Sequence, residues 1–348
     1  MSRLRKRRGG FTLVELVVVM TILALLTTVA VQSLSSVQDQ AHFDATQRTL
    51  TEIRGSILGP DAITREGELA SGGYLQDVGW LPAAPTDLMI PPVISSSPAL
   101  AMPPRNYSLT WRTYFGWSGP YITQPLRATG SVQLYDGYGR DFYGWFGGTP
   151  WTTPVYADFA LRSTGADGIM APAFPTPDDD PNVFNRDFPV REQPLIPLNM
   201  WSVDLRNLSI SFKNLTGVDL PADTISVLRL RVVVPRWDQA TAANPELALQ
   251  YRFTGSSTDR DGWQHYGAKT FSLPAIANNA SSSPIQFGET GLAAPNDFRE
   301  RRVPLGRRML YVVKESDGTP FSVSTTALCT ELHLSSKLTP KPIIIEIR

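Results

Sequence analysis

The feature that most constrains this chain is an uninterrupted apolar run close to its N-terminus. Residues 11–31, FTLVELVVVMTILALLTTVAV, contain a single ionisable side chain, that of Glu15. An α-helix needs about 20 consecutive apolar residues to cross the hydrocarbon layer of a bilayer. The run therefore predicts one transmembrane helix over residues 11–31.

A basic cluster precedes this run and orients it. Lys and Arg residues that flank a membrane helix stay on the cytoplasmic side. The N-terminus is therefore expected inside the cell, and everything after Gln32 outside the cytoplasm. The five basic residues of the cluster, all before Gly10, are Arg3, Arg5, Lys6, Arg7 and Arg8.

Composition excludes several function classes. The 32 basic residues equal the 32 acidic ones, so the charge balance gives no reason to expect binding to nucleic acid. The only cysteine, Cys329, rules out a disulfide within the chain, and three histidines offer little for catalysis or metal binding. No nucleotide-binding loop and no hydrolase motif is present. We therefore expect a protein that is not an enzyme.

The small residues Gly9 and Gly10 stand before the apolar run, whereas an ordinary secretory signal is cleaved after it. The segment RRGGFTLVE, residues 7–15, resembles the leader of type IV prepilins. The resemblance implies a prepilin peptidase that cuts after Gly10 and methylates the new N-terminal amine of Phe11. Residues 1–10 would then be a leader peptide.

Glu15 fits the same resemblance on physical grounds. A carboxylate at the centre of a hydrocarbon layer costs at least about 2.5 kcal/mol and needs a partner. In type IV pilin-like proteins the glutamate at this position is thought to pair with the N-terminal amine of a neighbouring subunit, which here would be that of Phe11. The alternative is a plain signal anchor, in which Glu15 reaches the membrane surface.

Helical spacing continues beyond the apolar run. Apolar residues recur three or four positions apart, and Gly59 and Pro60 then provide a C-cap and a stop. The pattern predicts one helix over residues 11–58, embedded in lipid first and packed on a domain afterwards. The recurring residues are Leu34, Val37, Ala41, Ala45, Leu50, Ile53 and Ile57.

The middle of the chain carries three further motifs. Residues 60–105 are rich in Gly, Pro, Ser and Ala and predict a loop. After them come WSGPY (117–121), DGYGRDFY (136–143) and STGADG (163–168), in an order similar to that of the major pseudopilin of type II secretion. Taken as residues alone, the glycines of the second motif indicate β-turns with no chemistry. The resemblance implies a small antiparallel sheet within residues 59–190, packed on the N-terminal helix.

In major pseudopilins the loop after the third motif binds calcium. Calcium takes six to eight oxygen ligands, which carboxylates, hydroxyls and backbone carbonyls supply. The resemblance therefore implies a calcium site, although the chain departs from the family pattern after Gly168 and inserts a proline-rich stretch. A solvated turn and loop are the alternative. The candidate ligands are the Leu161 carbonyl, Ser163, Asp167, Asp179 and Asp180.

Residues 191–348 go beyond a compact major pseudopilin and read as a β-rich C-terminal extension. Short alternating segments are separated by Asn, Gly, Asp and Pro, so the predicted fold class is α+β. Arg229 and Arg231 are expected on the solvent-facing side of their strand, and Trp201 in a core rather than on a sugar-binding surface. The predicted strands cover residues 208–212, 227–234, 249–253, 309–313, 321–328 and 343–347.

Together these features predict a structural subunit of a type II secretion pseudopilus or a type IV pilus-like filament. The expected location is the bacterial inner membrane, crossed once, with the globular part on the periplasmic or outer side. The expected partners are other pilin or pseudopilin subunits, prepilin peptidase and the inner-membrane assembly platform. The bulk of the C-terminal half favours a minor or tip subunit. The alternative is a membrane-tethered β-rich module that binds a surface or polysaccharide ligand.

Overall fold

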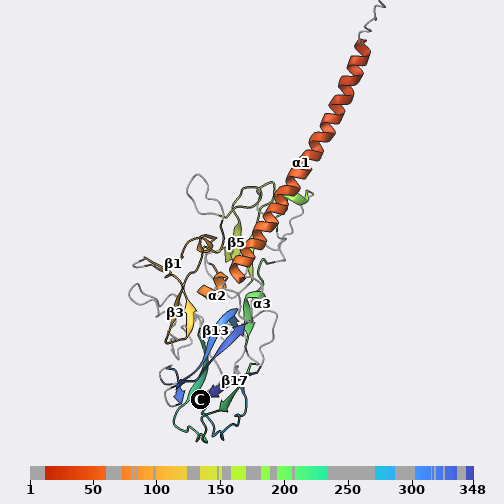
Figure 1. Ribbon diagram of the computed structural model, residues 1–348. Helices are drawn as coiled ribbons and strands as arrows, with labels where there is room; N and C mark the ends of the chain where they lie inside the picture. The colour runs from red at the N-terminus through yellow and green to blue at the C-terminus, as the bar shows by residue number, and fades with distance from the viewer. Residues whose placement is uncertain are drawn as a thin grey trace, which may run out of the picture.

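The computed structural model shows one long helix that leaves a mixed body of helices and strands (Figure 1). The N-terminal end of this helix, α1 (Leu13–Leu58), projects away from the body. Strand β17 (Ile343–Ile347) and the C-terminus lie near the opposite end of the molecule, and β13 (Gly306–Lys314) lies between them and the rest of the body. The residues that the structure describes are 12–59, 73–79, 81–82, 85–96, 99–123, 134–146, 149–150, 158–169, 182–188, 194–205, 208–233, 271–286, 302–314, 316, 319–323, 326–334 and 342–348.

Local signals at both ends set the length of α1. At its start, the Thr12 hydroxyl accepts the Glu15 N–H at 3.3 Å, and the Glu15 carboxylate accepts the Thr12 N–H at 2.9 Å. This reciprocal capping box satisfies two backbone donors that the first turn leaves free. At its end, Gly59 has a φ of 85° and donates its N–H to the Gly55 carbonyl at 2.8 Å. The long N-terminal helix predicted from spacing is confirmed.

Only the C-terminal half of α1 packs against the body. Thr46, Leu50, Ile53 and Ile57 are buried, and their separations of four, three and four residues place them on one face of the helix. Among the described residues, no helix combines the length and the apolarity that crossing a membrane requires.

The region between α1 and residue 105 is more structured than the predicted loop. Helix α2 (Tyr74–Val78) buries Tyr74, Leu75 and Val78, so these apolar side chains outweigh the surrounding glycines. Within this region, the proline-rich residues 91–104 form the hairpin of β1 (Val93–Ser96) and β2 (Ala99–Ala101). Like the predicted loop, this segment is not helical. The next elements are η1 (Pro85–Leu88), β3 (Asn106–Ser108), β4 (Thr113–Phe115), β5 (Tyr143–Phe146), β6 (Thr149–Pro150), β7 (Phe159–Arg162), η2 (Val183–Asn185) and α3 (Leu198–Trp201).

Two three-stranded sheets dominate the C-terminal half and confirm its β-rich character. The order β10-β13-β16 is antiparallel throughout, whereas β11-β9-β17 pairs β17 parallel to β9. Two further pairs, β12-β8 and β14-β15, are antiparallel. The bounds are β8 (Ser202–Asp204), β9 (Ser209–Asn214), β10 (Leu228–Val233), β11 (Ile285–Gln286), β12 (Arg302–Pro304), β14 (Ser322–Val323), β15 (Thr326–Ala327) and β16 (Cys329–Leu334).

Strand β13 is buried on both faces and joins two apolar cores. Its Met309, Tyr311 and Val313 belong to the core that contains the buried face of α1. Its Leu310 and Val312 belong to a second core, which the β11-β9-β17 sheet closes from the other side. Alternate residues of a strand point to opposite faces, so one strand serves both cores. The first core therefore crosses residue 190, the predicted domain boundary, which itself lies outside the described residues.

Two predictions about side chains in the C-terminal half had different outcomes. Trp201 is 1% exposed, which confirms its prediction as a core residue. The expectation for Arg231 was wrong, because its side chain is also 1% exposed. The polar face of β10 lies over the first core rather than in solvent, since Val233 on that face packs there.

Arg308 fastens the C-terminal sheet to α2. Its guanidinium donates to the carbonyls of Leu75 and Gln76, both at 3.0 Å, and to that of Leu305 at 2.9 Å. The last carbonyls of a helix lack partners within it, so the arginine caps α2 from a distant part of the chain and shares the Leu75 carbonyl with the N–H of Gly79. Full burial lowers the pKa of Arg308 to about 10, while nearby Asp77 opposes that shift, so the side chain stays charged at neutral pH.

Replacing Arg308 should therefore loosen the body. We expect Arg308→Met to lower the free energy of unfolding by about 3 kcal/mol, because the carbonyls of Gln76 and Leu305 lose their donor and that of Leu75 keeps only the N–H of Gly79. The adjacent Arg307→Gln is the matched control. It removes a half-exposed pair with Glu331, which is worth less than about 1 kcal/mol. Denaturant unfolding followed by tryptophan fluorescence measures both, and equal losses in the two variants would contradict the assignment.

Candidate assembly site

The N-terminal half of α1 is the candidate assembly site, and Glu15 stands at its start. The Glu15 carboxylate also accepts the Thr12 hydroxyl at 2.9 Å, and both Thr12 contacts end on the same carboxylate oxygen, Oε2. The predicted processing residues, Gly10 and Phe11, lie outside the described residues. The structure therefore places Glu15 in the first turn of α1, within the capping box.

Apolar side chains surround this half of the helix. Twelve large ones between Leu13 and Val29 are exposed by 47–79%. A helix that is apolar all round is normally buried in a protein core or a membrane. Figure 1 shows this half leaving the body, so its cover must come from lipid or from other chains. The exposed set is Leu13, Val14, Leu16, Val17, Val18, Val19, Met20, Ile22, Leu23, Leu25, Leu26 and Val29.

The DGYGRDFY loop fixes the other half of α1 to the body. The Gly137 N–H donates to the Thr46 hydroxyl at 2.9 Å, and the Gly137 carbonyl lies 2.7 Å from Nδ1 of His42. A Cβ added to Gly137 would stand 1.9 Å from the His42 carbonyl oxygen. The helix and the loop thus approach so closely that only glycine fits between them.

A hydrogen-bond network joins this loop to the STGADG turn. Asp136 accepts the N–H of Arg140 at 2.8 Å through one carboxylate oxygen, and the Ser163 hydroxyl at 2.5 Å through the other. The Arg140 guanidinium donates to the carbonyls of Gly165 and Ala166. The second and third motifs therefore form one unit that rests on α1.

The WSGPY motif contributes to a second polar cluster, centred on the buried Asp77 of α2. The Asp77 carboxylate accepts hydrogen bonds from the Ser118 and Tyr121 hydroxyls and pairs with Arg105 at 3.4 Å. Burial, followed by the negative charge of Asp77, raises the pKa of Tyr121, so its hydroxyl remains a donor. The Tyr121 carbonyl accepts the Ser56 hydroxyl at 2.9 Å, which ties this motif to α1 as well.

The candidate calcium ligands are only partly described. The Ser163 hydroxyl is fully buried against Asp136, and Asp167 accepts the N–H of Ile169 at 2.9 Å. Leu161 lies on β7, while Asp179 and Asp180 lie outside the described residues. Within the described ranges, no group of three or more His, Cys, Asp or Glu side chains could hold a metal ion. The oxygen donors seen here do not make a calcium shell without the two outlying aspartates.

Sequence reasoning missed three of these positions. It treated Gly137 as a turn residue, because contact with a helix 91–95 positions away leaves no local signal. It did not single out Arg140, although the residue lies inside a motif, and it did not single out Asp77. The only available signal for Asp77 was a carboxylate flanked by apolar residues in YLQDV, a pattern that predicts burial with partners.

Comparison with known proteins identifies the N-terminal segment. Residues 5–31 match the family model of the prokaryotic N-terminal methylation motif. The N-terminus is therefore a prepilin leader of the type IV pilin-like kind. Neither the curated proteins nor the solved structures yielded a match to this chain.

The contact between Gly137 and α1 predicts the effect of a single methyl group. We expect Gly137→Ala to lower the free energy of unfolding by about 3 kcal/mol, because the loop must move and lose its bonds to His42 and Thr46. Gly55→Ala is the control on α1 itself. Its Cβ would meet nothing within 4 Å, so it should stabilise the helix by about 0.5–1 kcal/mol. Thermal unfolding followed by circular dichroism tests the pair, and a neutral Gly137→Ala would contradict the close approach.

Proposed function

We propose that this protein is a structural subunit of a type II secretion pseudopilus or a type IV pilus-like filament. One observation carries the proposal: the part of α1 that projects from the body with exposed apolar side chains lies within the methylation motif, residues 5–31. Fully burying a Val, Leu, Ile or Met side chain is worth about 1.5–3 kcal/mol. Twelve such side chains supply a large driving force for burying α1 in lipid, and packing against other helices then adds van der Waals contacts. The role proposed is structural and not catalytic.

The proposal includes processing and location. Prepilin peptidase would cut after Gly10 and leave Phe11 as a methylated N-terminus. Before assembly the subunit would cross the bacterial inner membrane once, with its body on the periplasmic or outer side. The inner-membrane assembly platform and other pilin or pseudopilin subunits would be its partners. The motif supports a membrane-anchored filament subunit, and these finer assignments extend it.

Glu15 supplies specificity within this packing. In a filament the carboxylate would leave water and need a cation, and the amine of Phe11 on a neighbouring subunit offers one. In the single chain, the Oε2 oxygen of Glu15 accepts hydrogen bonds from the N–H and the hydroxyl of Thr12. Exchanging the Thr12 contacts for an amine would convert an intrachain cap into an intersubunit bond. An apolar helix alone has no such means of fixing register.

The shape of the body favours a minor or tip subunit. Strand β17 and the C-terminus lie near the end of the molecule opposite the projecting tip of α1 (Figure 1). If α1 lies along the filament, this end faces the subunits further from the membrane. In a repeating subunit, this end of the body would have to pack against the next subunits of the filament. A tip subunit has no subunits beyond it, so its C-terminal half meets no such constraint.

Replacing Glu15 separates a filament subunit from a tethered binding module. We expect Glu15→Val to insert in the membrane at the normal level and to lose assembly, because the intersubunit pair is gone. Thr12→Val is the control, since it removes the capping hydroxyl at a cost of about 1 kcal/mol and keeps the carboxylate. It should still assemble. Fractionation of sheared filaments from membranes measures both, and normal assembly of Glu15→Val would sink the proposal.

We also propose calcium as a ligand of the loop that follows STGADG, with Asp167, Asp179 and Asp180 as its carboxylates and Ser163 and the Leu161 carbonyl as neutral oxygens. Clustered carboxylates suit a hard cation. A ligand that binds only the folded state raises the unfolding temperature. We expect a chelator to lower the melting temperature of the full chain in detergent, and Asp167→Ala to abolish that difference. Identical melting with and without the chelator would refute calcium binding.

A further inference from the structure

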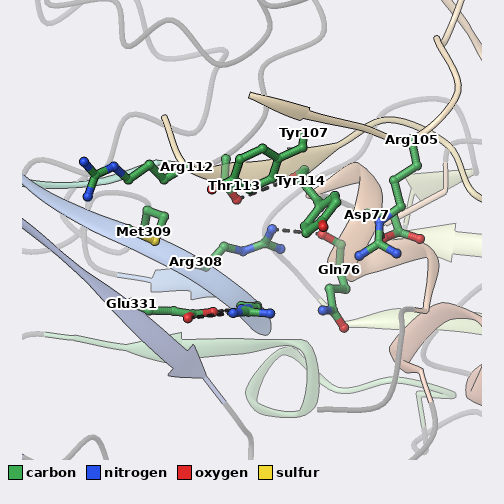
Figure 2. Close-up of a pocket in the computed structure, with 11 residues that line it drawn as sticks. Gln76, Asp77, Arg105, Tyr107, Arg112, Thr113, Tyr114, Arg308, Met309 and Glu331 are labelled. Carbon is green, nitrogen blue, oxygen red and sulfur yellow. Dashed lines mark hydrogen bonds and ion pairs between the residues drawn. The ribbon is translucent and has the colours of Figure 1, made fainter. Parts of the chain in front are cut away.

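A cavity of about 220 Å³ opens between the β3-β4 hairpin and the C-terminal sheet, and neither of the proposed roles uses it. Four arginines line it and only two carboxylates, so its walls carry excess positive charge. Figure 2 shows Arg308 pointing from β13 toward Gln76 and Asp77, with Tyr107 and Tyr114 on the hairpin side. The arginines are Arg105, Arg112, Arg307 and Arg308, and the carboxylates are Asp77 and Glu331.

Two of the four arginines already have hydrogen-bond partners within the chain. Arg307 pairs with Glu331 through both carboxylate oxygens. Arg308 spends its donors on backbone carbonyls, so its charge faces no carboxylate in direct contact. Because that charge is fully buried, water screens it weakly and it adds to the positive potential of the cavity.

The other two arginines keep donors for a ligand. Arg105 uses Nε toward Asp77, and its guanidinium lies 4.5 Å from the centre of the Tyr114 ring. Arg112 has one contact among the described residues, 3.8 Å to the weakly accepting thiol of Cys329. Both side chains are exposed, so an incoming anion can reach their remaining N–H groups.

The hairpin holds Arg112 in an unusual conformation. Its φ of 48° is left-handed, a region where glycine or asparagine would be less strained. Neighbouring Trp111 is buried and packs edge-on against Tyr311 of β13, with ring centroids 5.4 Å apart. The turn is therefore anchored on the sheet, and Figure 2 shows the guanidinium of Arg112 at the end of the cavity away from Arg105.

Exposed aromatic rings complete the surface. Tyr107 and Tyr114 are 40% and 46% exposed, and their ring centroids lie 4.9 Å apart. Tyrosine and arginine together are typical of the residues that dominate binding energy at protein interfaces. The cavity is smaller than the roughly 300–1,000 Å³ of sites that enclose a small-molecule ligand. Its size suits one inserted side chain.

We propose that this cavity binds an acidic side chain, Asp or Glu, presented by a segment of a partner protein. Arg105 donates to the carboxylate, Arg112 adds positive charge from the other end of the cavity, and Tyr107 and Tyr114 cover the adjoining backbone. The proposal does not depend on filament assembly, since none of these residues lies on α1. Loss of assembly in Glu15→Val with intact binding, or the reverse, tells the two proposals apart.

The test uses the full chain in detergent and a fluorescent Gly-Ser peptide with two central glutamates. Fluorescence anisotropy at low salt gives the Kd. We expect the matching glutamine peptide to bind at least about tenfold more weakly, because a charge-assisted hydrogen bond to arginine is lost. Arg105→Gln should weaken the glutamate peptide by about tenfold, and Arg112→Gln, which removes a more distant charge, should weaken it less. Raised ionic strength should weaken it as well.

Arg48→Gln is the matched control, an exposed arginine on α1 outside the cavity. It should leave the Kd unchanged, and melting curves of all variants exclude misfolding as the cause of any loss. Equal affinity for the two peptides, or equal effects of Arg105→Gln and Arg48→Gln, would overturn the proposal. Displacement of the peptide by a galacturonate oligomer that binds more tightly would also overturn it, in favour of an acidic polysaccharide.

Discussion

The rest of the structure depends on the exposure of the apolar N-terminal half of α1. The described body does not bury this half, so lipid or other chains have to. The helix is continuous from Leu13 to Leu58, so its two halves cannot fold back on each other. The N-terminal half therefore stays exposed for packing with other molecules, while the C-terminal half is packed against the body. Because hydrophobic burial has no direction of its own, the capped carboxylate of Glu15 provides the only polar contact in the first turn that could set how neighbouring helices align.

Fixing the second half of α1 organises the body. Gly137 brings the DGYGRDFY loop against the helix, and Tyr121 brings the WSGPY motif against it. Asp77 links that motif to α2, and Arg308 links α2 to the C-terminal sheet. These polar contacts run from the helix to the C-terminal sheet beside a shared apolar core. The C-terminal half thus has a defined position relative to α1, as a subunit that presents it on a filament would require.

The sequence predicted what depends on local pattern. Spacing and caps placed α1, alternation placed β9, β10, β13 and β17, and the leader was recognisable from nine residues. Long-range contacts could not be predicted. The solvent-facing prediction for Arg231 failed because strand alternation gives two faces and cannot say that both are covered. Within the candidate site, Glu15 was found from its isolation in an apolar run, whereas Gly137 and Arg140 needed the fold.

Site-specific photo-crosslinking from Val18 tests the central claim most directly. This side chain is 50% exposed in the single chain and lies one turn beyond Glu15. A photoreactive residue there, activated in cells that produce filaments, should join the chain to other pilin-like subunits, and the products should appear in the sheared filament fraction. Products that contain lipid alone, with no crosslinked subunit in any fraction, would contradict assembly through α1.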